Sequence, residues 1–261
     1  MKKIALTSLV AVFAASTANA ANIINNNPLY RPIKNQFYSV TAIDSHSEDT
    51  NKWGLSEEFG YGFTNKMSAI VSTRATQSDT FDHTSWQNIG LELNYRALDM
   101  DNWKADVYGG YGLTPVWGDH RPFLDEDDTM YRWVAGVRGG YTTAGWTLAA
   151  HAEYAYVNTE SFNWGDDGVH AMSLGIDGQL VLNQNWNLNA GVEYTGILSD
   201  KYFGITKVKN AGSWTGEVGV NYNINNDMYV GAYVNGEIAH ATGDWEFKDG
   251  FGFGIKFGAQ F

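Results

Sequence analysis

The sequence predicts an all-β fold, a closed antiparallel up-and-down transmembrane β-barrel of twelve strands. Three observations support this prediction. Segment after segment alternates apolar residues with polar or small ones, which is the period of a β-strand. Short turns and longer polar loops alternate between these segments. The chain of 261 residues has 29 glycines, 15% aromatic residues and only 4 prolines, and this composition suits a sheet with aromatic bands.

The alternation is clear in residues 103–113, 146–156, 186–194 and 214–224. In the first of these segments, Trp103, Val107 and Leu113 fall on one side, while Lys104 and Asp106 fall on the other. One face of each segment is therefore apolar and the other polar or small, as expected when one face contacts lipid and the other lines a lumen.

The connections between the segments set the strand count. Five short stretches carry turn residues, namely 64–66, 99–102, 142–145, 183–185 and 225–227. Six longer polar loops are expected at about 45–52, 76–84, 115–129, 158–168, 198–212 and 241–250. Eleven connections separate twelve strands, so both termini should lie at the short-turn end.

The last strand carries a family resemblance. Residues 251–261 place aromatic and aliphatic side chains on every second position and end on an aromatic residue. This stretch resembles the C-terminal signal strand of bacterial outer-membrane β-barrels, with Phe257 and Phe261 in the place of the assembly signal. The resemblance implies recognition by the barrel-assembly machinery. It also implies an outer-membrane location, with long loops extracellular and both termini periplasmic.

The N-terminus supports export. Met1-Lys2-Lys3 precedes a short apolar run and an A-x-A site at Ala18–Ala20, so residues 1–20 are expected to be a signal peptide. Residues 21–35 are expected to form a periplasmic tail, and residues 36–261 the transmembrane barrel. No segment has the eighteen consecutive apolar residues of a membrane-spanning helix.

Composition narrows the possible partners. The formal net charge of −12 argues against nucleic acid as a partner. The chain has no cysteine and no cluster with metal-ligand spacing, so neither a metal nor a cofactor is expected. Outer-membrane lipid, lipopolysaccharide and small polar solutes are the expected partners, and the sequence does not fix the oligomeric state.

The inward faces of the strands predict two walls of opposite charge. The basic wall consists of Arg74, Arg96, Lys104, Arg132 and Arg138. The acidic wall consists of Glu153, Asp177, Glu193, Glu217 and Glu237. Lys256 points inward beside the acidic wall and is expected to mark the seam between the two.

Two functions fit such a lumen. Many inward glycines remove side-chain volume and favour a narrow porin-like channel for passive diffusion of small polar solutes. Inward tyrosines and opposed charges fit the runner-up, a structural or surface-interaction barrel whose lumen is closed by ion pairs. A remote third alternative is an outer-membrane hydrolase, because His83-Thr84-Ser85 has the His-x-Ser spacing of the outer-membrane phospholipase family. No convincing orienting asparagine accompanies it, so we expect no enzymatic activity and no catalytic residues.

Tryptophans mark both proposed membrane interfaces. Trp103, Trp146 and Trp186 follow short turns, while Trp133 and Trp214 lie just inside long loops.

Two segments fit the pattern less well. Glu57 falls on the lipid-facing side of its strand, where a bulge or a position near the headgroups is needed to accommodate it. The first strand has ambiguous faces, and we expect Tyr38, Val40 and Ala42 to point outward.

Overall fold

The computed structural model describes residues 27–47, 49–78, 83–114, 117–118, 130–159, 168–198, 201–202, 206–207, 212–240 and 250–261. Its long strands are β1 (Phe37–His46), β2 (Asp49–Gly62), β3 (Met67–Ser78), β4 (His83–Asp99), β5 (Trp103–Thr114), β7 (Met130–Thr142), β8 (Trp146–Thr159), β9 (Val169–Val181), β10 (Trp186–Ile197), β13 (Gly212–Asn223), β14 (Met228–His240) and β15 (Gly252–Gln260). Three two-residue strands lie between them, namely β6 (Trp117–Gly118), β11 (Lys201–Tyr202) and β12 (Thr206–Lys207).

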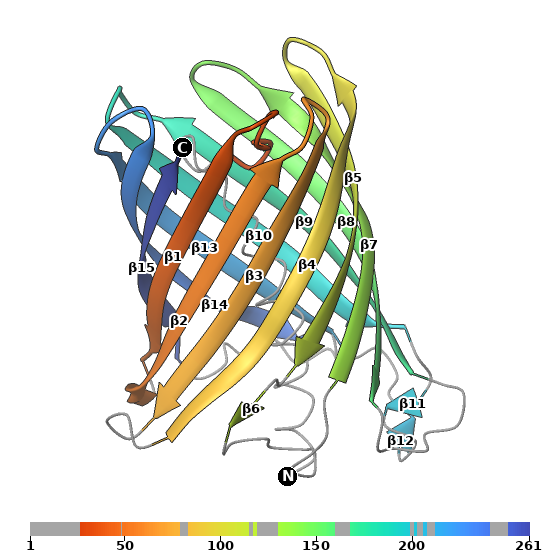
Figure 1. The fold of residues 1–261 in the computed structure, drawn as a ribbon. Helices are drawn as coiled ribbons and strands as arrows, with labels where there is room; N and C mark the ends of the chain where they lie inside the picture. Colours follow the sequence, from red (N-terminus) through yellow and green to blue (C-terminus); the bar gives the residue numbers. More distant parts are fainter. Residues whose placement is uncertain are drawn as a thin grey trace.

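The long strands close into one antiparallel barrel (Figure 1). Each pairs with its neighbours along the chain, and β1 pairs with β15 through Tyr38 opposite Gln260 and Val40 opposite Gly258. Closure leaves no long strand with an unpaired edge in lipid. The prediction of a closed, twelve-stranded, up-and-down barrel is therefore confirmed. Among the described residues, no helix is long and apolar enough to cross a membrane.

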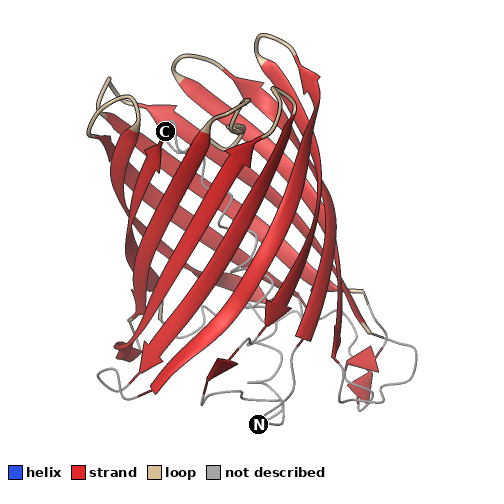
Figure 2. Cartoon of the chain, in the orientation of Figure 1, coloured by secondary structure: helices blue, strands red, loops and turns tan. Residues whose placement is uncertain are grey.

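The short connections lie together at one end of the barrel, which is also where the chain terminates (Figure 2). Turns such as residues 63–66 and 224–227 join strands there. One connection at the opposite end is shorter than predicted, because β1 continues to His46 and β2 begins at Asp49. The backbones of polar residues can form strand pairs beyond the apolar belt. Both strands therefore continue through polar residues that the sequence assigned to a loop.

The faces of β1 are the reverse of those predicted. Phe37 and Ile43 point outward, with 36% and 42% of their surfaces exposed, whereas Tyr38 and Val40 are 2% and 6% exposed. Ala42 shares the inward face with Tyr38 and Val40. The prediction was wrong because the lumen holds an apolar cluster here, formed by Tyr38, Val40, Ile70 and Tyr229.

Glu57 does point outward, and it does so without a bulge. The pairing of β1 with β2 is regular from Phe37 to Ser45. The hydroxyls of Ser39 and Thr41, on the same outer face, donate to the two carboxylate oxygens of Glu57 at 2.7 and 2.5 Å. These two hydrogen bonds offset part of the cost of a carboxylate on the lipid-facing surface.

The five predicted belt tryptophans are exposed on the outer face. Trp103, Trp146 and Trp186 begin β5, β8 and β10 at the short-turn end. Trp133 and Trp214 lie near the other ends of β7 and β13. The indoles thus form two bands separated by the length of the strands, which are the positions that suit them at the two interfaces of a membrane.

Candidate functional site: the barrel lumen

Residues 27–36, which we call the lumen segment, precede β1 and lie against the inner wall at the short-turn end. Lys34 forms a bridge with Gly62, and the backbone N–H of Asn35 donates to the Gly62 carbonyl at 2.8 Å. The Tyr30 ring meets the Tyr38 ring edge to face at 6.2 Å. One end of the segment is therefore fixed to β1 and β2.

The other end of the lumen segment reaches distant strands. The Asn27 amide donates to the hydroxyls of Thr142 and Thr147, on β7 and β8, at 3.3 and 3.0 Å. Leu29 is 1% exposed, and its carbonyl accepts a hydrogen bond from Arg96 at 2.7 Å. Because five long strands separate β1 from β8 along either side of the barrel, the segment crosses the bore.

Arg31 anchors the middle of this crossing. Its Nε lies 3.4 Å from Asp106, whose side chain is fully buried and also accepts from Arg96 Nε at 2.5 Å. Burial lowers the pKa of Arg31, with a further contribution from Arg138, while Asp106 and other acidic groups oppose that shift. Arginine starts so basic that Arg31 remains charged near neutral pH. The short-turn half of the lumen is therefore narrowed by a segment tied to the wall.

The predicted basic wall is neutralised locally. Arg74 forms a bidentate pair with Asp44 of β1, at 2.7 and 2.5 Å, and Arg132 pairs with Glu153 of β8. Lys104 bonds Asp99 at 2.6 Å, close to the short-turn rim. Three residues predicted as a uniform basic surface thus each have a carboxylate partner.

The predicted acidic residues also have local partners. The two ring nitrogens of His151 lie 3.0 Å from Asp177 and 3.0 Å from Glu193, so a protonated imidazole can donate to both. Lys256 lies 3.2 Å from Glu217, and its ammonium sits 4.8 Å from the centre of the Tyr233 ring. Glu237 is half-buried on β14, opposite Thr215 of β13.

These pairs follow the wall and do not cross the bore. Arg132 with Glu153 and Arg96 with Asp106 join adjacent strands. Arg74 with Asp44 joins strands two positions apart. Each of these pairs joins strands that are adjacent or two positions apart, so these pairs neutralise charge along the wall.

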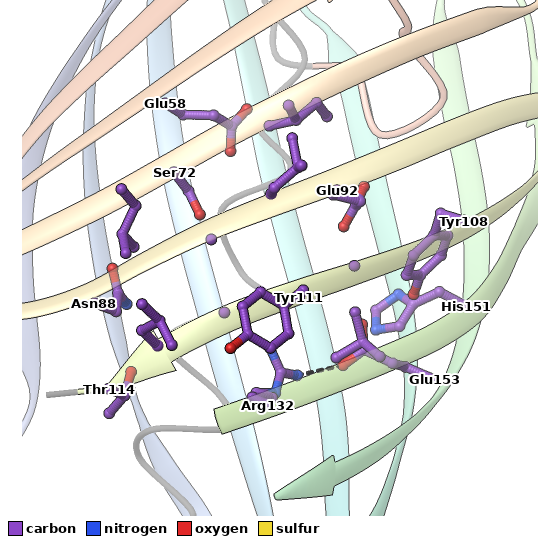
Figure 3. Close-up of a pocket in the computed structure, with 18 of the residues that line it drawn as sticks. Glu58, Ser72, Asn88, Glu92, Tyr108, Tyr111, Thr114, Arg132, His151 and Glu153 are labelled. Carbon is purple, nitrogen blue, oxygen red and sulfur yellow. Dashed lines mark hydrogen bonds and ion pairs between the residues drawn. The ribbon is translucent and has the colours of Figure 1, made fainter. Parts of the chain in front are cut away.

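A pocket opens in the lumen from mid-barrel toward the long-loop end (Figure 3). We call it the loop-side hollow; Glu58, Glu92, Tyr108, Arg132, Arg138 and Glu153 line it. Figure 3 shows Glu58 and Glu92 across the hollow from Arg132 and Glu153. Gly90, Gly110 and Gly112, on adjacent β4 and β5, also line it. Because these three positions carry no side chain, only small neighbours such as Ser72 and Val134 cover the wall between the charged groups.

The sequence did not reveal two parts of this site. Asp44 shares the face of the first strand that was predicted to point outward, so its pairing with Arg74 was missed. The lumen segment was expected to be a tail, although the run Leu29-Tyr30-Arg31 is more apolar and bulky than a solvated tail requires. That run was the available signal.

The hydrolase candidates lie mainly outside what can be described. Of the His-x-Ser candidate His83-Thr84-Ser85, only the backbone of His83 and Thr84 is described, at the start of β4. Within the described part of the chain, no group of three or more potential metal ligands comes together.

No family model matches the chain, and no curated protein matches it. Solved structures do. The NanC porin aligns with a TM-score of 0.60 at 10% identity, covering 85% of this chain and 98% of that one. An outer-membrane channel from Pseudomonas putida F1 gives 0.55 at 12% identity, covering 88% and 96%. The translocator domain of the autotransporter NalP from Neisseria meningitidis gives 0.53 at 12% identity, covering 97% of each chain.

Identities this low support a shared fold only, so the role of this chain must be inferred from its site. These comparisons and the closed sheet lead to one conclusion: the chain has the twelve-stranded β-barrel fold of bacterial outer-membrane proteins.

Proposed function

We propose that this chain is a porin-like channel for passive diffusion of small polar solutes across a bacterial outer membrane. The observation that supports this most is the loop-side hollow. Its charged groups are bound along the wall, and glycines replace side chains between them. The described wall of this lumen is polar, which suits hydrated solutes better than apolar ones.

The proposal includes the orientation and processing expected from the sequence. Residues 1–20 act as a signal peptide, the short turns and both termini face the periplasm, and the long loops face outside. Phe257 and Phe261, which are exposed on the outer face, present the assembly signal to the barrel-assembly machinery. Lipopolysaccharide is the expected neighbour of the loop end. Two of the similar structures are described as a porin and an outer-membrane channel, which favours this role over an enzymatic one.

A second candidate, a closed structural barrel, is favoured by the lumen segment. Leu29 and Arg31 occupy the bore at the short-turn end, and a segment held there permanently would prevent conduction. The two candidates differ in one measurable property, the ionic conductance of the folded protein.

Single-channel recording in planar bilayers tests the proposal. The purified, folded chain should produce discrete conductance steps, and the steps should persist in symmetric solutions of different salts. Folding is checked by heat-modifiable migration on SDS gels. A folded protein that never conducts would exclude the channel and support the closed barrel. Replacement of Arg74 and Arg138 by alanine should change ion selectivity if the arginines line the conducting path.

A further inference from the structure

Two opposite charges in the loop-side hollow are unpaired. Arg138 on β7 is 7% exposed, and its Nε and Nη1 atoms have no hydrogen-bond partner among the described residues. One carboxylate oxygen of Glu92, on β4, is likewise buried without a partner. Both residues line the same hollow. Glu92 exerts the strongest attraction of any carboxylate on Arg138, yet the two form no ion pair.

Most other charged strand residues in this region have an ion-pair partner. Arg132 is paired with Glu153, His151 with Asp177 and Glu193, and Arg96 with Asp106. The exception at Arg138 and Glu92 is therefore local. A buried charge left without a partner is costly, so a site that keeps one of each sign is suited to a molecule that supplies both counter-charges.

The shape of the site leaves room for such a molecule. Strands β4 and β7 flank β5, which places their backbones about 10 Å apart at the usual strand spacing. Glu92 lies opposite Gly110 of β5, whereas Arg138 lies opposite Asp106, four residues nearer the short-turn end, so the two side chains enter the hollow at different heights. The Tyr108 ring lies 5.6 Å from the Arg138 guanidinium carbon and covers one of its faces. The Nε and Nη1 atoms of the guanidinium are buried and make no hydrogen bond within the described part of the chain.

We propose that the loop-side hollow is a binding site for small zwitterions of the α-amino-acid type, and this rests on the proposed channel function. The carboxylate of the solute accepts hydrogen bonds from Arg138, whose N–H edge suits a carboxylate. The ammonium of the solute donates to Glu92, with Glu58 as the next acidic group in the hollow. A simple anion would face Glu58, Glu92 and Glu153, and a simple cation would face Arg132 and Arg138. An uncharged solute would leave both unpaired charges unsatisfied.

Three solutes of nearly equal size test the charge pattern, namely L-alanine, L-alaninamide and L-lactate. They represent a zwitterion, a cation and an anion. Each is added to single channels, and interruption of the ionic current is measured against concentration. L-alanine should interrupt the current at concentrations about tenfold lower than the other two, because only it makes both charge-assisted contacts. Equal potency of all three solutes would overturn the proposal.

Variants separate the site from the channel. Arg138→Gln and Glu92→Gln should each weaken the effect of L-alanine by about tenfold or more, while steps carried by potassium chloride persist. Lys66→Gln and Asp101→Asn remove the same charges in exposed turns at the short-turn end and should leave the L-alanine effect unchanged. An unchanged response in both lumen variants would overturn the site.

The proposed channel can fail independently. If the protein does not conduct, the steps in potassium chloride are absent before any solute is added. Calorimetric titration of L-alanine into the folded protein in detergent then tests the site directly. Heat that saturates for the natural chain and is lost in Arg138→Gln supports the site, and absence of saturable heat overturns it.

Discussion

The two halves of the lumen are filled in opposite ways. At the short-turn end, Leu29, Arg31 and Asp106 meet in the bore, and the side chains of Tyr38 and Tyr229 are almost fully buried beside them. At the long-loop end, glycines at positions 90, 110 and 112 leave the wall covered only by small neighbours such as Ser72 and Val134. Both halves are built from the same twelve strands. The strand number therefore sets the outer diameter, while side-chain volume and the lumen segment decide how much of the bore remains.

The difference also separates two uses of buried charge. Arg96, Asp106 and Arg31 form a connected group that ties the lumen segment to the wall. In the loop-side hollow, Arg138 and Glu92 remain unpaired. The ion pairs of the lumen segment therefore hold protein against protein, whereas Arg138 and Glu92 hold no other described side chain in an ion pair.

Removal of the lumen segment should have the largest effect on this comparison. A chain lacking residues 27–34 loses the contacts with Thr142, Arg96 and Asp106 and should conduct several-fold better, because the narrow half then resembles the wide one. Single-channel conductance measures the change. Ile33→Ser combined with Lys34→Ser, at exposed positions of the same segment, is the control and should conduct like the natural chain. An unchanged conductance after deletion would mean that the constriction lies elsewhere.

Filling the wide half should have the next largest effect. Gly112→Phe places a ring in the loop-side hollow, and conductance should fall by about half because the ring narrows the bore there. A side chain at position 112 starts 3.3 Å from the Ile89 carbonyl, so the backbone must adjust slightly. Gly178→Phe, at a lipid-facing position of β9, adds the same ring outside the bore. Equal losses in both variants would indicate a general folding defect and contradict the assignment.

Breaking the charged group at the short-turn end should affect stability more than conductance. Arg96→Met removes the partner of Asp106 and of the Leu29 carbonyl. Loss of one member of a buried ion pair should destabilise the barrel by about 3 kcal/mol. Urea-induced unfolding followed by tryptophan fluorescence measures this loss. Lys66→Met, in an exposed turn, should change stability little. A similar loss in that variant would show that the effect of Arg96→Met does not come from its ion pair.

Much of the fold could be predicted from the sequence because lipid imposes a strict pattern. Each strand must present an apolar face, and every backbone group must be paired, so alternation and turn spacing sufficed to give twelve strands. The pattern failed in β1, where Tyr38 and Val40 are apolar residues that point inward. Period-2 alternation cannot tell lipid from an apolar patch within the lumen, and only the partners Tyr229 and Ile70 reveal which one applies.

The site was less predictable because it depends on neighbours across strands. The inward direction of Arg74 or Arg132 follows from alternation, but their neutralisation by Asp44 and Glu153 depends on register. The sequence therefore predicted two walls of opposite charge, whereas local pairing neutralises much of that charge. The path of residues 27–36 depends on a tertiary contact between Arg31 and Asp106, for which no periodic signal exists.

The smallest expected effect comes from two adjacent glutamates on opposite faces of β2. Glu58 lines the loop-side hollow and accepts a hydrogen bond from Tyr38 at 2.6 Å. Glu57 points outward to Ser39 and Thr41. Glu58→Gln keeps an acceptor for Tyr38 but removes a carboxyl facing the bore, so at an alkaline pH, where that carboxyl is ionised, the preference for potassium over chloride should fall modestly. Reversal potentials in a salt gradient measure that preference.

Glu57→Gln is the matched control, since it removes the same charge at the same height but on the other side of the wall. A charge outside the bore is separated from the ions by the sheet, and the salt in the bore screens it further. The reversal potential should therefore stay at the value of the natural chain. If instead Glu57→Gln shifted selectivity as much as Glu58→Gln, ions would respond to charge on either face. That result would contradict the idea that the inward-facing charges set ion selectivity. It would not contradict the barrel fold.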